Sequence, residues 1–244
     1  MEQTLAAQKD LAKSPTKFQA ISDIFLEPRK ALVAVRENPS WFALPLALNL
    51  AAFIGFTFWY YTTVNVEWLI DHMLAQQGEM SSEQAEATRR YLQPSFLMNS
   101  GIVFGGLTIL FFNALFALYY HLLAKLGGEN TLGIGNWFAF SVWTSFPAII
   151  NTLGMFFVYW LDGTHQIDIN DLLFTSFNNL LFHFPFDHAW YSFMNSIQLT
   201  TFWSIGMAAY GYTLWTGSKL GWGCIVACFP YTLIFGIWAL ILAT

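Results

Sequence analysis

Residues 101–147 read GIVFGGLTILFFNALFALYYHLLAKLGGENTLGIGNWFAFSVWTSFP and contain two long apolar segments joined by a glycine-rich connector. The basic residue of this stretch, Lys125, and its acidic residue, Glu129, both lie at the connector. Because an α-helix rises about 1.5 Å per residue, each apolar segment is long enough to cross a hydrocarbon layer of about 30 Å. The stretch predicts a helical hairpin inside a membrane.

The composition of the whole chain agrees with that prediction. Of 244 residues, 56% are hydrophobic and 10% are charged, whereas soluble domains average about 25% charged residues. Residues 1–20 lack the apolar stretch and cleavage site of a signal peptide. Cys224 and Cys228 lie in an apolar segment, where we expect them to pack as small apolar groups. The chain is predicted to be an all-α polytopic integral membrane protein.

Five apolar segments are predicted to span the membrane. We divide the chain into a cytosolic N-terminal tail with an amphipathic surface helix, residues 1–40, and a five-helix transmembrane domain, residues 41–244. Pro147 and Pro230 are expected to bend the third and fifth spans. The predicted spans are residues 41–63, 96–124, 137–161, 191–215 and 220–243.

The distribution of cations predicts the orientation. Five spans place the two termini on opposite sides. With a cytoplasmic N-terminus, the cytoplasmic face carries most of the cations, as the positive-inside rule requires, and the C-terminus is extracytoplasmic. The cytoplasmic cations are then Lys9, Lys13, Lys17, Arg29, Lys30, Arg36, Lys125 and Lys219, against Arg89 and Arg90 on the other face.

The segment before the first span is predicted to contain a short amphipathic helix. Residues 1–21 are polar and are expected to form a loosely ordered tail, and a helix is expected to begin near Pro28 and to end at Asn38. One prediction places the helix on the membrane surface with its cations at the headgroups. The alternative, a cytosolic helix docked on the rest of the protein, stays open. The residues assigned to the membrane-surface helix are Phe25, Pro28, Arg29, Lys30, Leu32, Val35 and Arg36.

Two polar inserts separate the spans on the outer side. In residues 64–95, Ser81 is expected to cap a helix. In residues 162–190, an interfacial helix is expected over residues 171–184. The second insert also holds imidazole and carboxylate groups that could bind a transition metal, although scattered polar residues in an aromatic loop are the simpler interpretation. No metal or cofactor is predicted. The metal candidates are His165, His183, Asp187 and His188.

A few polar and small residues lie within the spans, which contain no central Asp, Glu, Lys or Arg. Amides there are expected to hydrogen-bond between helices, with a solute path as the alternative. The GxxxG pattern of Gly101 and Gly105 allows close packing, either internally or between two copies. The residues assigned to helix packing or a polar path are Gly101, Gly105, Asn113, His121, Pro147, Asn151, Asn195 and Gln198.

Several of these segments together resemble the Yip-domain membrane proteins, named for Ypt/Rab-interacting proteins. The resemblance implies five spans, a cytosolic N-terminus and a non-enzymatic role. Eukaryotic members are associated with Rab GTPases and assemble with one another, and some bacterial members accompany export-type ABC transporters. The matching residues are Phe25, Glu27, Pro28, Asn38, Pro39, Pro45, the LLAKLGG run ending at Gly127 and Gly128, Ser141, Trp143, Ser145 and Pro147.

The chain lacks the acidic, aromatic N-terminal region and the Asp-Leu-Tyr-Gly-Pro type motif of eukaryotic members. A Rab-type GTPase partner is therefore not expected, and the resemblance implies a bacterial inner-membrane member. No nucleotide fingerprint, catalytic motif or nucleic-acid module is present. We predict a non-catalytic membrane adaptor or scaffold, self-associating or an accessory subunit of a transport or envelope-maintenance complex. The alternative is a transporter or channel for an uncharged solute, lipid or ion.

Overall fold

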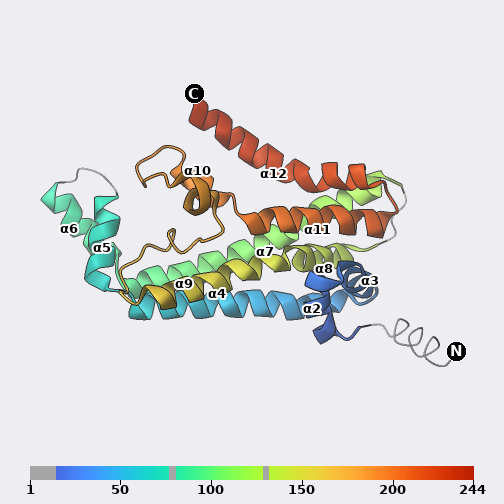
Figure 1. The fold of residues 1–244 in the computed structure, drawn as a ribbon, viewed down its shortest axis with the longest axis horizontal. Helices are drawn as coiled ribbons and strands as arrows, with labels where there is room; N and C mark the ends of the chain where they lie inside the picture. The colour runs from blue at the N-terminus through green and yellow to red at the C-terminus, as the bar shows by residue number, and fades with distance from the viewer. Residues whose placement is uncertain (1–14, 77–80, 129–131) are drawn as a thin grey trace. The chain divides into compact units, whose positions relative to one another are not determined.

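The described chain consists of helices joined by turns and loops. The structure, a computed structural model, describes residues 15–76, 81–128 and 132–244 (Figure 1). Over these residues, extended pairing is limited to an isolated antiparallel bridge between Ser176 and Gln198. The all-α prediction is confirmed for this part of the chain.

Four helical segments are long and apolar enough to cross a membrane: Pro39–Thr63, Pro94–Leu126, Ile134–Asp162 and Leu220–Ala243. The first joins the 3-10 turn η1 (Pro39–Phe42) to helix α4 (Ala43–Thr63). The second is α7 (Pro94–Leu126) and the fourth is α12 (Leu220–Ala243), which contains Pro230. Four of the five predicted spans therefore lie within segments of suitable length and composition.

The third segment is interrupted at Pro147. Helix α8 (Ile134–Ser145) is followed by the 3-10 turn η2 (Phe146–Ala148) and then by α9 (Ile149–Asp162). Proline has no backbone N–H and its ring crowds the preceding turn, which weakens the α-helical hydrogen bonds around it. At Pro147, where a bend was predicted, the α-helix is interrupted, whereas α12 continues as an α-helix through Pro230.

The fourth predicted span, residues 191–215, is not one continuous helix. Helix α10 (Tyr191–Ser196) is short, and α11 (Leu199–Thr216) begins after a break. At the break the backbone pairs with the preceding insert: Phe177 N donates to Ile197 O at 2.8 Å, and Leu199 N donates to Thr175 O at 3.0 Å. Helix α11 is not among the four segments that meet the length and hydropathy requirements for a span.

The N-terminal segment contains two helices where one was predicted. Helix α3 (Pro28–Glu37) confirms the predicted limits. Helix α2 (Lys17–Leu26) lies partly in the segment expected to be a loose tail, and that expectation is wrong from Lys17 onward. A capping box explains the start of α2, because Gln19 N donates to Thr16 Oγ1 at 3.3 Å and Thr16 N donates to Gln19 Oε1 at 2.8 Å. Residues 1–14 of the predicted tail lie outside the described residues.

The first insert forms α5 (Val66–Ala75) and α6 (Ser82–Tyr91). The predicted cap at Ser81 is confirmed, because Gln84 N donates to Ser81 Oγ at 3.2 Å.

The second insert lacks the helix predicted over residues 171–184. It is made of turns and one short π-helical stretch, η3 (Asn178–Phe182). Side-chain amides compete with helical hydrogen bonds here: Asn179 Nδ2 donates to Asn170 O at 2.9 Å, and Asn178 Nδ2 donates to Phe184 O at 3.2 Å. The apolar periodicity was therefore misleading in this segment.

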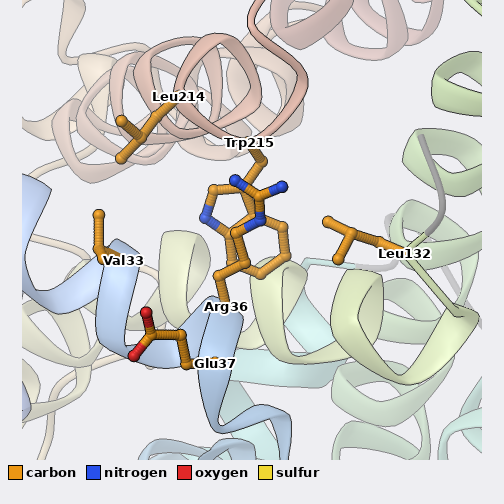
Figure 2. A pocket seen from close by; sticks show the side chains of 6 residues that line it. All are labelled: Val33, Arg36, Glu37, Leu132, Leu214 and Trp215. Atoms are coloured by element: carbon orange, nitrogen blue, oxygen red, sulfur yellow. The ribbon is translucent and has the colours of Figure 1, made fainter. Parts of the chain in front are cut away.

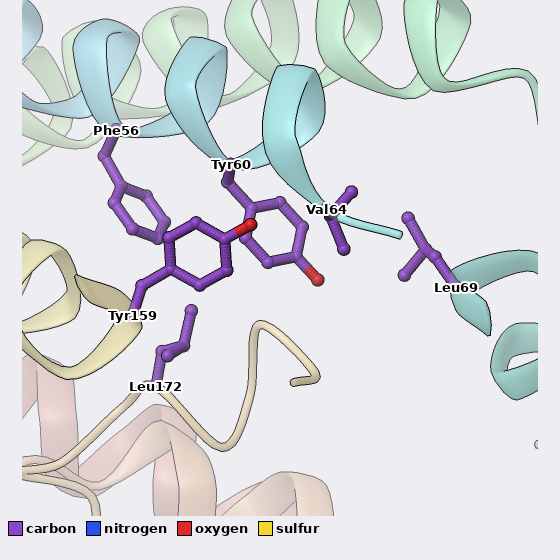
Figure 3. Close-up of a cluster of buried hydrophobic side chains, with 6 residues drawn as sticks. All are labelled: Phe56, Tyr60, Val64, Leu69, Tyr159 and Leu172. Carbon is purple, nitrogen blue, oxygen red and sulfur yellow. The ribbon is translucent and has the colours of Figure 1, made fainter. Parts of the chain in front are cut away.

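The chain divides into two compact units, each with its own buried core. The first unit comprises Met1–Ala47, Asn113–Pro147 and Ser204–Cys228, and the second comprises Leu48–Phe112, Ala148–Trp203 and Phe229–Thr244. Aromatic rings from α8 and α11 fill the first core, where the ring centres of Trp137 and Trp215 are 5.5 Å apart. The second core contains Phe56, Tyr60, Val64, Leu69, Tyr159 and Leu172 (Figure 3).

Hydrogen bonds fasten the second insert to this second core. Tyr60 Oη donates to Ile167 O at 2.9 Å, and Asn65 N donates to His165 O at 2.8 Å. Since Tyr60 belongs to α4 and Asn65 follows that helix directly, the insert is anchored at the end of a predicted span.

Candidate functional site

The two glycines of the GxxxG pattern in α7 pack against α4 within the second unit. A Cβ at Gly105 would lie 2.2 Å from Phe53 Cζ, and a Cβ at Gly101 would lie 3.7 Å from Thr57 Cγ2. Both partners belong to α4. Of the two alternatives left by the sequence, the geometry of these glycines supports internal packing.

An amide in α7 joins it to α8 in the first unit. Asn113 Oδ1 accepts hydrogen bonds from Ser141 Oγ at 3.1 Å and from Ser145 Oγ at 3.3 Å. The amide oxygen is thus satisfied by the neighbouring helix α8, as a polar group in an apolar segment requires. The prediction of an interhelical bond is confirmed for Asn113.

A polar cluster in the second unit is centred on Asn151 of α9. Asn151 Nδ2 donates to Thr200 Oγ1 at 2.6 Å and also to Gln198 Oε1, while Thr175 Oγ1 donates to Asn151 Oδ1. The cluster joins a predicted span, the second insert and the start of α11. Sequence reasoning identified Asn151 and Gln198 but missed the two threonines, because short hydroxyl side chains give no distinct signal in an apolar segment.

Asn195 lies beside this cluster but is incompletely satisfied. Its Oδ1 accepts a hydrogen bond of 3.0 Å from Ser176 Oγ. Its Nδ2 is buried and has no hydrogen-bond partner among the described residues. Asn195 is the last residue but one of the short helix α10, just before the break at residues 197–198.

His121 lies near the C-terminal end of α7 in the first unit. Its Nδ1 is buried and is also without a hydrogen-bond partner within the described part of the chain. The nearby Tyr119 donates from its hydroxyl to Val226 O at 2.8 Å, which joins α7 to α12. The predicted polar residues therefore fall into separate places: the structure joins Asn151 with Gln198, whereas Asn113 and His121 belong to the other unit.

The apolar face of α3 is buried on protein. Leu32 and Val35 are completely buried, and Trp215 Nε1 donates to Leu32 O at 3.0 Å. Leu32 and Val35 therefore do not face a lipid surface, and the docked alternative accounts for their burial.

The other residues assigned to the membrane-surface helix lie around this buried face. Phe25 packs on Phe146, with ring centres 5.8 Å apart. Pro28, at the start of α3, is half-buried. The side chains of Arg29, Lys30 and Arg36 are exposed. Their predicted contact with headgroups stays a prediction.

The four candidate metal ligands do not form a metal site. Among the described residues, no group of three or more His, Cys, Asp and Glu side chains could hold a metal ion. His165 Nδ1 lies 3.1 Å from the Tyr159 hydroxyl, and His188 stacks on Phe184 with ring centres 3.9 Å apart. His183 ends η3 in a left-handed conformation. These side chains are used in local packing.

A contact between an imidazole and a carboxylate, one from each insert, was missed by the sequence reasoning. His72 Nε2 of α5 lies 3.3 Å from Asp168 Oδ2, although the residues are far apart in the sequence. Burial raises the pKa of the neighbouring Asp171 carboxyl, and the negative charge of Asp168 raises that pKa further, whereas His72 lowers it. This arrangement links α5 to the second insert.

These features define an all-helical protein whose long apolar segments are suited to a bilayer. The chain belongs to the Yip1 domain family, because the family model of the Yip1 domain matches residues 22–241. The match extends the resemblance seen in the first three predicted spans to α12. Comparisons with curated proteins and with solved structures found no match.

Proposed function

We propose that this Yip1 family protein is a non-catalytic membrane adaptor or scaffold, acting through self-association or as an accessory subunit of a transport or envelope-maintenance complex. The observation that carries the proposal is the outward apolar surface of α7 and α12. In the spanning windows of these helices, 6% and 11% of the residues are buried. Such surfaces require lipid or other membrane helices as neighbours.

The outward side chains of α7 recur every three or four residues and so form a continuous face. A face of this kind can pack against a helix of another protein without rearranging the interior. Its exposed residues are Val103, Phe104, Leu107, Leu110, Phe111, Leu115, Leu118 and Leu122.

The interior of the protein also supports a structural role. Asn113 and Asn151 both have hydrogen-bond partners on neighbouring segments, and the GxxxG glycines contact α4. Polar groups used in this way stabilise helix packing. We place the N-terminus in the cytoplasm, the C-terminus outside, and the protein in a bacterial inner membrane, with α11 as the fifth span.

Affinity capture from native membranes tests the scaffold proposal. Two differently tagged copies of the full chain are co-expressed, one is captured in mild detergent, and the captured proteins are quantified by mass spectrometry. We expect a stoichiometric membrane protein or the second copy. Recovery of neither argues against the proposal.

A matched pair of cysteine variants locates the contact. Phe111→Cys lies on the outward face of α7, whereas Val142→Cys is buried in α8. Both are made with Cys224 and Cys228 replaced by serine, since both native cysteines are exposed. Self-association through α7 predicts disulfide-linked dimers for Phe111→Cys and none for Val142→Cys.

The second candidate function is transport, and the break between α10 and α11 is the observation that favours it. Non-helical backbone within an apolar region is tolerated where it is buried in protein or lines a polar cavity. Here it adjoins the unsatisfied Asn195 amide. Glycerol-driven swelling of proteoliposomes tests this candidate: transport predicts faster swelling than in empty liposomes and a reduction in Asn195→Leu.

A further inference from the structure

A pocket of about 300 Å³ lies in the first unit, between α3, the end of α11 and the segment before α8 (Figure 2). Its lining combines three aliphatic side chains, one indole ring, one cation and one anion. This volume is at the small end of the range for ligand sites. The lining residues are Val33, Arg36, Glu37, Leu132, Leu214 and Trp215.

Hydrogen bonds to the backbone hold the walls of this pocket in place. Trp215 Nε1 donates to Leu32 O at 3.0 Å, and Asn136 Nδ2 donates to Arg36 O at 3.0 Å. The second bond satisfies one of the carbonyls left unpaired at the C-terminal end of α3. The helix that carries Arg36 and Glu37 is therefore fixed to both α11 and α8.

The lining residues lie next to the ends of predicted spans. Glu37 comes two positions before the segment Pro39–Thr63, and Leu132 comes two positions before Ile134–Asp162. Trp215 is in the last turn of α11. Side chains at these positions are at the level where helices leave the hydrocarbon, which is the level of lipid headgroups.

Both charged groups of the pocket are available for a ligand. Within the part of the chain that the structure describes, neither the Arg36 guanidinium nor the Glu37 carboxylate forms an ion pair. In Figure 2 the Arg36 side chain extends toward Trp215, while the Glu37 carboxylate is directed to the side of Val33. A ligand that satisfies both needs an anionic and a cationic group joined by a short linker, with an apolar part beside them.

We propose that this pocket binds the headgroup of a zwitterionic phospholipid of the phosphatidylethanolamine class. The phosphate accepts hydrogen bonds from the Arg36 guanidinium, which matches phosphate geometry, and the ammonium group contacts the Glu37 carboxylate. The glycerol and the first acyl carbons contact Val33, Leu132 and Leu214. This site is independent of the adaptor proposal, because it requires no protein partner.

Native mass spectrometry of the detergent-purified full chain tests the site. The protein is titrated separately with dihexanoyl phosphatidylethanolamine, dihexanoyl phosphatidylglycerol and free phosphoethanolamine. We expect one saturable phosphatidylethanolamine site that binds more tightly than phosphatidylglycerol. Arg36→Gln should weaken the binding of both lipids by about tenfold or more, since it removes a charge-assisted hydrogen bond.

Two further variants separate the roles of the charges. Glu37→Gln should abolish the preference for phosphatidylethanolamine over phosphatidylglycerol while keeping phosphate-dependent binding. Arg29→Gln is the matched control, because Arg29 is exposed on the same helix and does not line the pocket. Arg36→Lys, which keeps the charge, should retain more binding than Arg36→Gln. Thermal unfolding of each variant checks that it is folded.

Three outcomes overturn the proposal. One is the absence of saturable lipid binding to the wild-type protein. Another is equal lipid affinity of Arg36→Gln and Arg29→Gln, which places the lipid elsewhere. The third is free phosphoethanolamine binding as tightly as the lipid, which assigns the pocket to a soluble phosphate ester.

Discussion

The indole N–H of Trp215 donates a 3.0 Å hydrogen bond to the backbone carbonyl of Leu32, and both residues are buried. Helix α3 and helix α11 are far apart in the sequence, so this bond fixes the amphipathic segment to the helical core of the first unit. Helix α3, which the sequence alone would allow to lie on a lipid surface, is therefore part of the folded domain.

Replacing Trp215 with phenylalanine should destabilise the protein. The variant loses the hydrogen bond to Leu32 O and part of the indole packing, with an expected cost of about 1–3 kcal/mol. Thermal unfolding in detergent measures the effect. The control is Trp160→Phe, because Trp160 is exposed on α9. Equal losses in the two variants would contradict the structural role of the Trp215 bond.

Adding a methyl group at Gly105 should disturb the packing of α7 on α4. Its Cβ would lie 2.2 Å from Phe53 Cζ, whereas a Cβ at the adjacent Gly106 meets no atom within 4 Å. Gly105→Ala should cost about 1–3 kcal/mol, as overpacking does, and Gly106→Ala should have little effect on stability. Chemical unfolding of the two variants checks this difference.

A second substitution gives this prediction a rescue test. Phe53→Leu shortens the side chain that fills the space at Gly105, so the double variant should recover part of the stability lost by Gly105→Ala. If the stability losses of Gly105→Ala and Phe53→Leu simply add in the double variant, the contact between Gly105 and Phe53 does not cause the loss in Gly105→Ala.

Asn151→Leu should destabilise the second unit. It leaves the side chains of Thr175, Gln198 and Thr200 without their shared partner, and unsatisfied buried polar groups cost about 1–3 kcal/mol. The matched control is Asn99→Leu, since Asn99 is exposed on α7. Unfolding measurements on both variants decide the matter, and a larger loss for Asn99→Leu would refute the prediction.

Asp171→Asn should stabilise the protein near pH 7. Burial, with the nearby charge of Asp168, raises the pKa of Asp171 above its ordinary value of 3.8, so the folded state favours the protonated carboxyl. The stabilisation that protonation provides is present below the ordinary pKa and is lost as the pH rises through the raised value. The advantage of the asparagine variant should therefore shrink as the pH falls through the raised pKa.

Melting temperatures measured at intervals from pH 7 down to pH 4, close to the ordinary pKa of 3.8, follow this dependence. Asp187→Asn serves as the control, because Asp187, like Asp171, is an exposed carboxylate in the same insert. A stability gain for Asp171→Asn that is the same at every pH would show that charge is not its source.

Sequence reasoning succeeded where a local pattern determines the structure. Four of the five predicted spans lie in helices suited to a membrane. Pro28 and Asn38 marked the limits of α3, and Pro147 marked the interruption between α8 and α9. It failed over residues 171–184, where the side chains of Asn178 and Asn179 bond to the backbone and replace the helix that the apolar spacing suggested.

The candidate sites were predicted less completely than the fold. Asn151 and Gln198 were identified as polar residues within apolar segments, but their common partners Thr175 and Thr200 were not. The pocket at Arg36 was also missed, because its walls come from three segments that are distant in the sequence. Contacts of this kind depend on tertiary packing and leave no local periodic pattern.

The sequence by itself determined that this chain is a helical membrane protein of the Yip1 domain family, because apolar length and a series of short motifs are local properties of the chain. The tertiary structure decided that Leu32 and Val35 contact protein and that the ring of Phe53 packs against Gly105. It also decided that the predicted fourth span is broken before Leu199. Each of these depends on which side chain from a distant segment fills the neighbouring space.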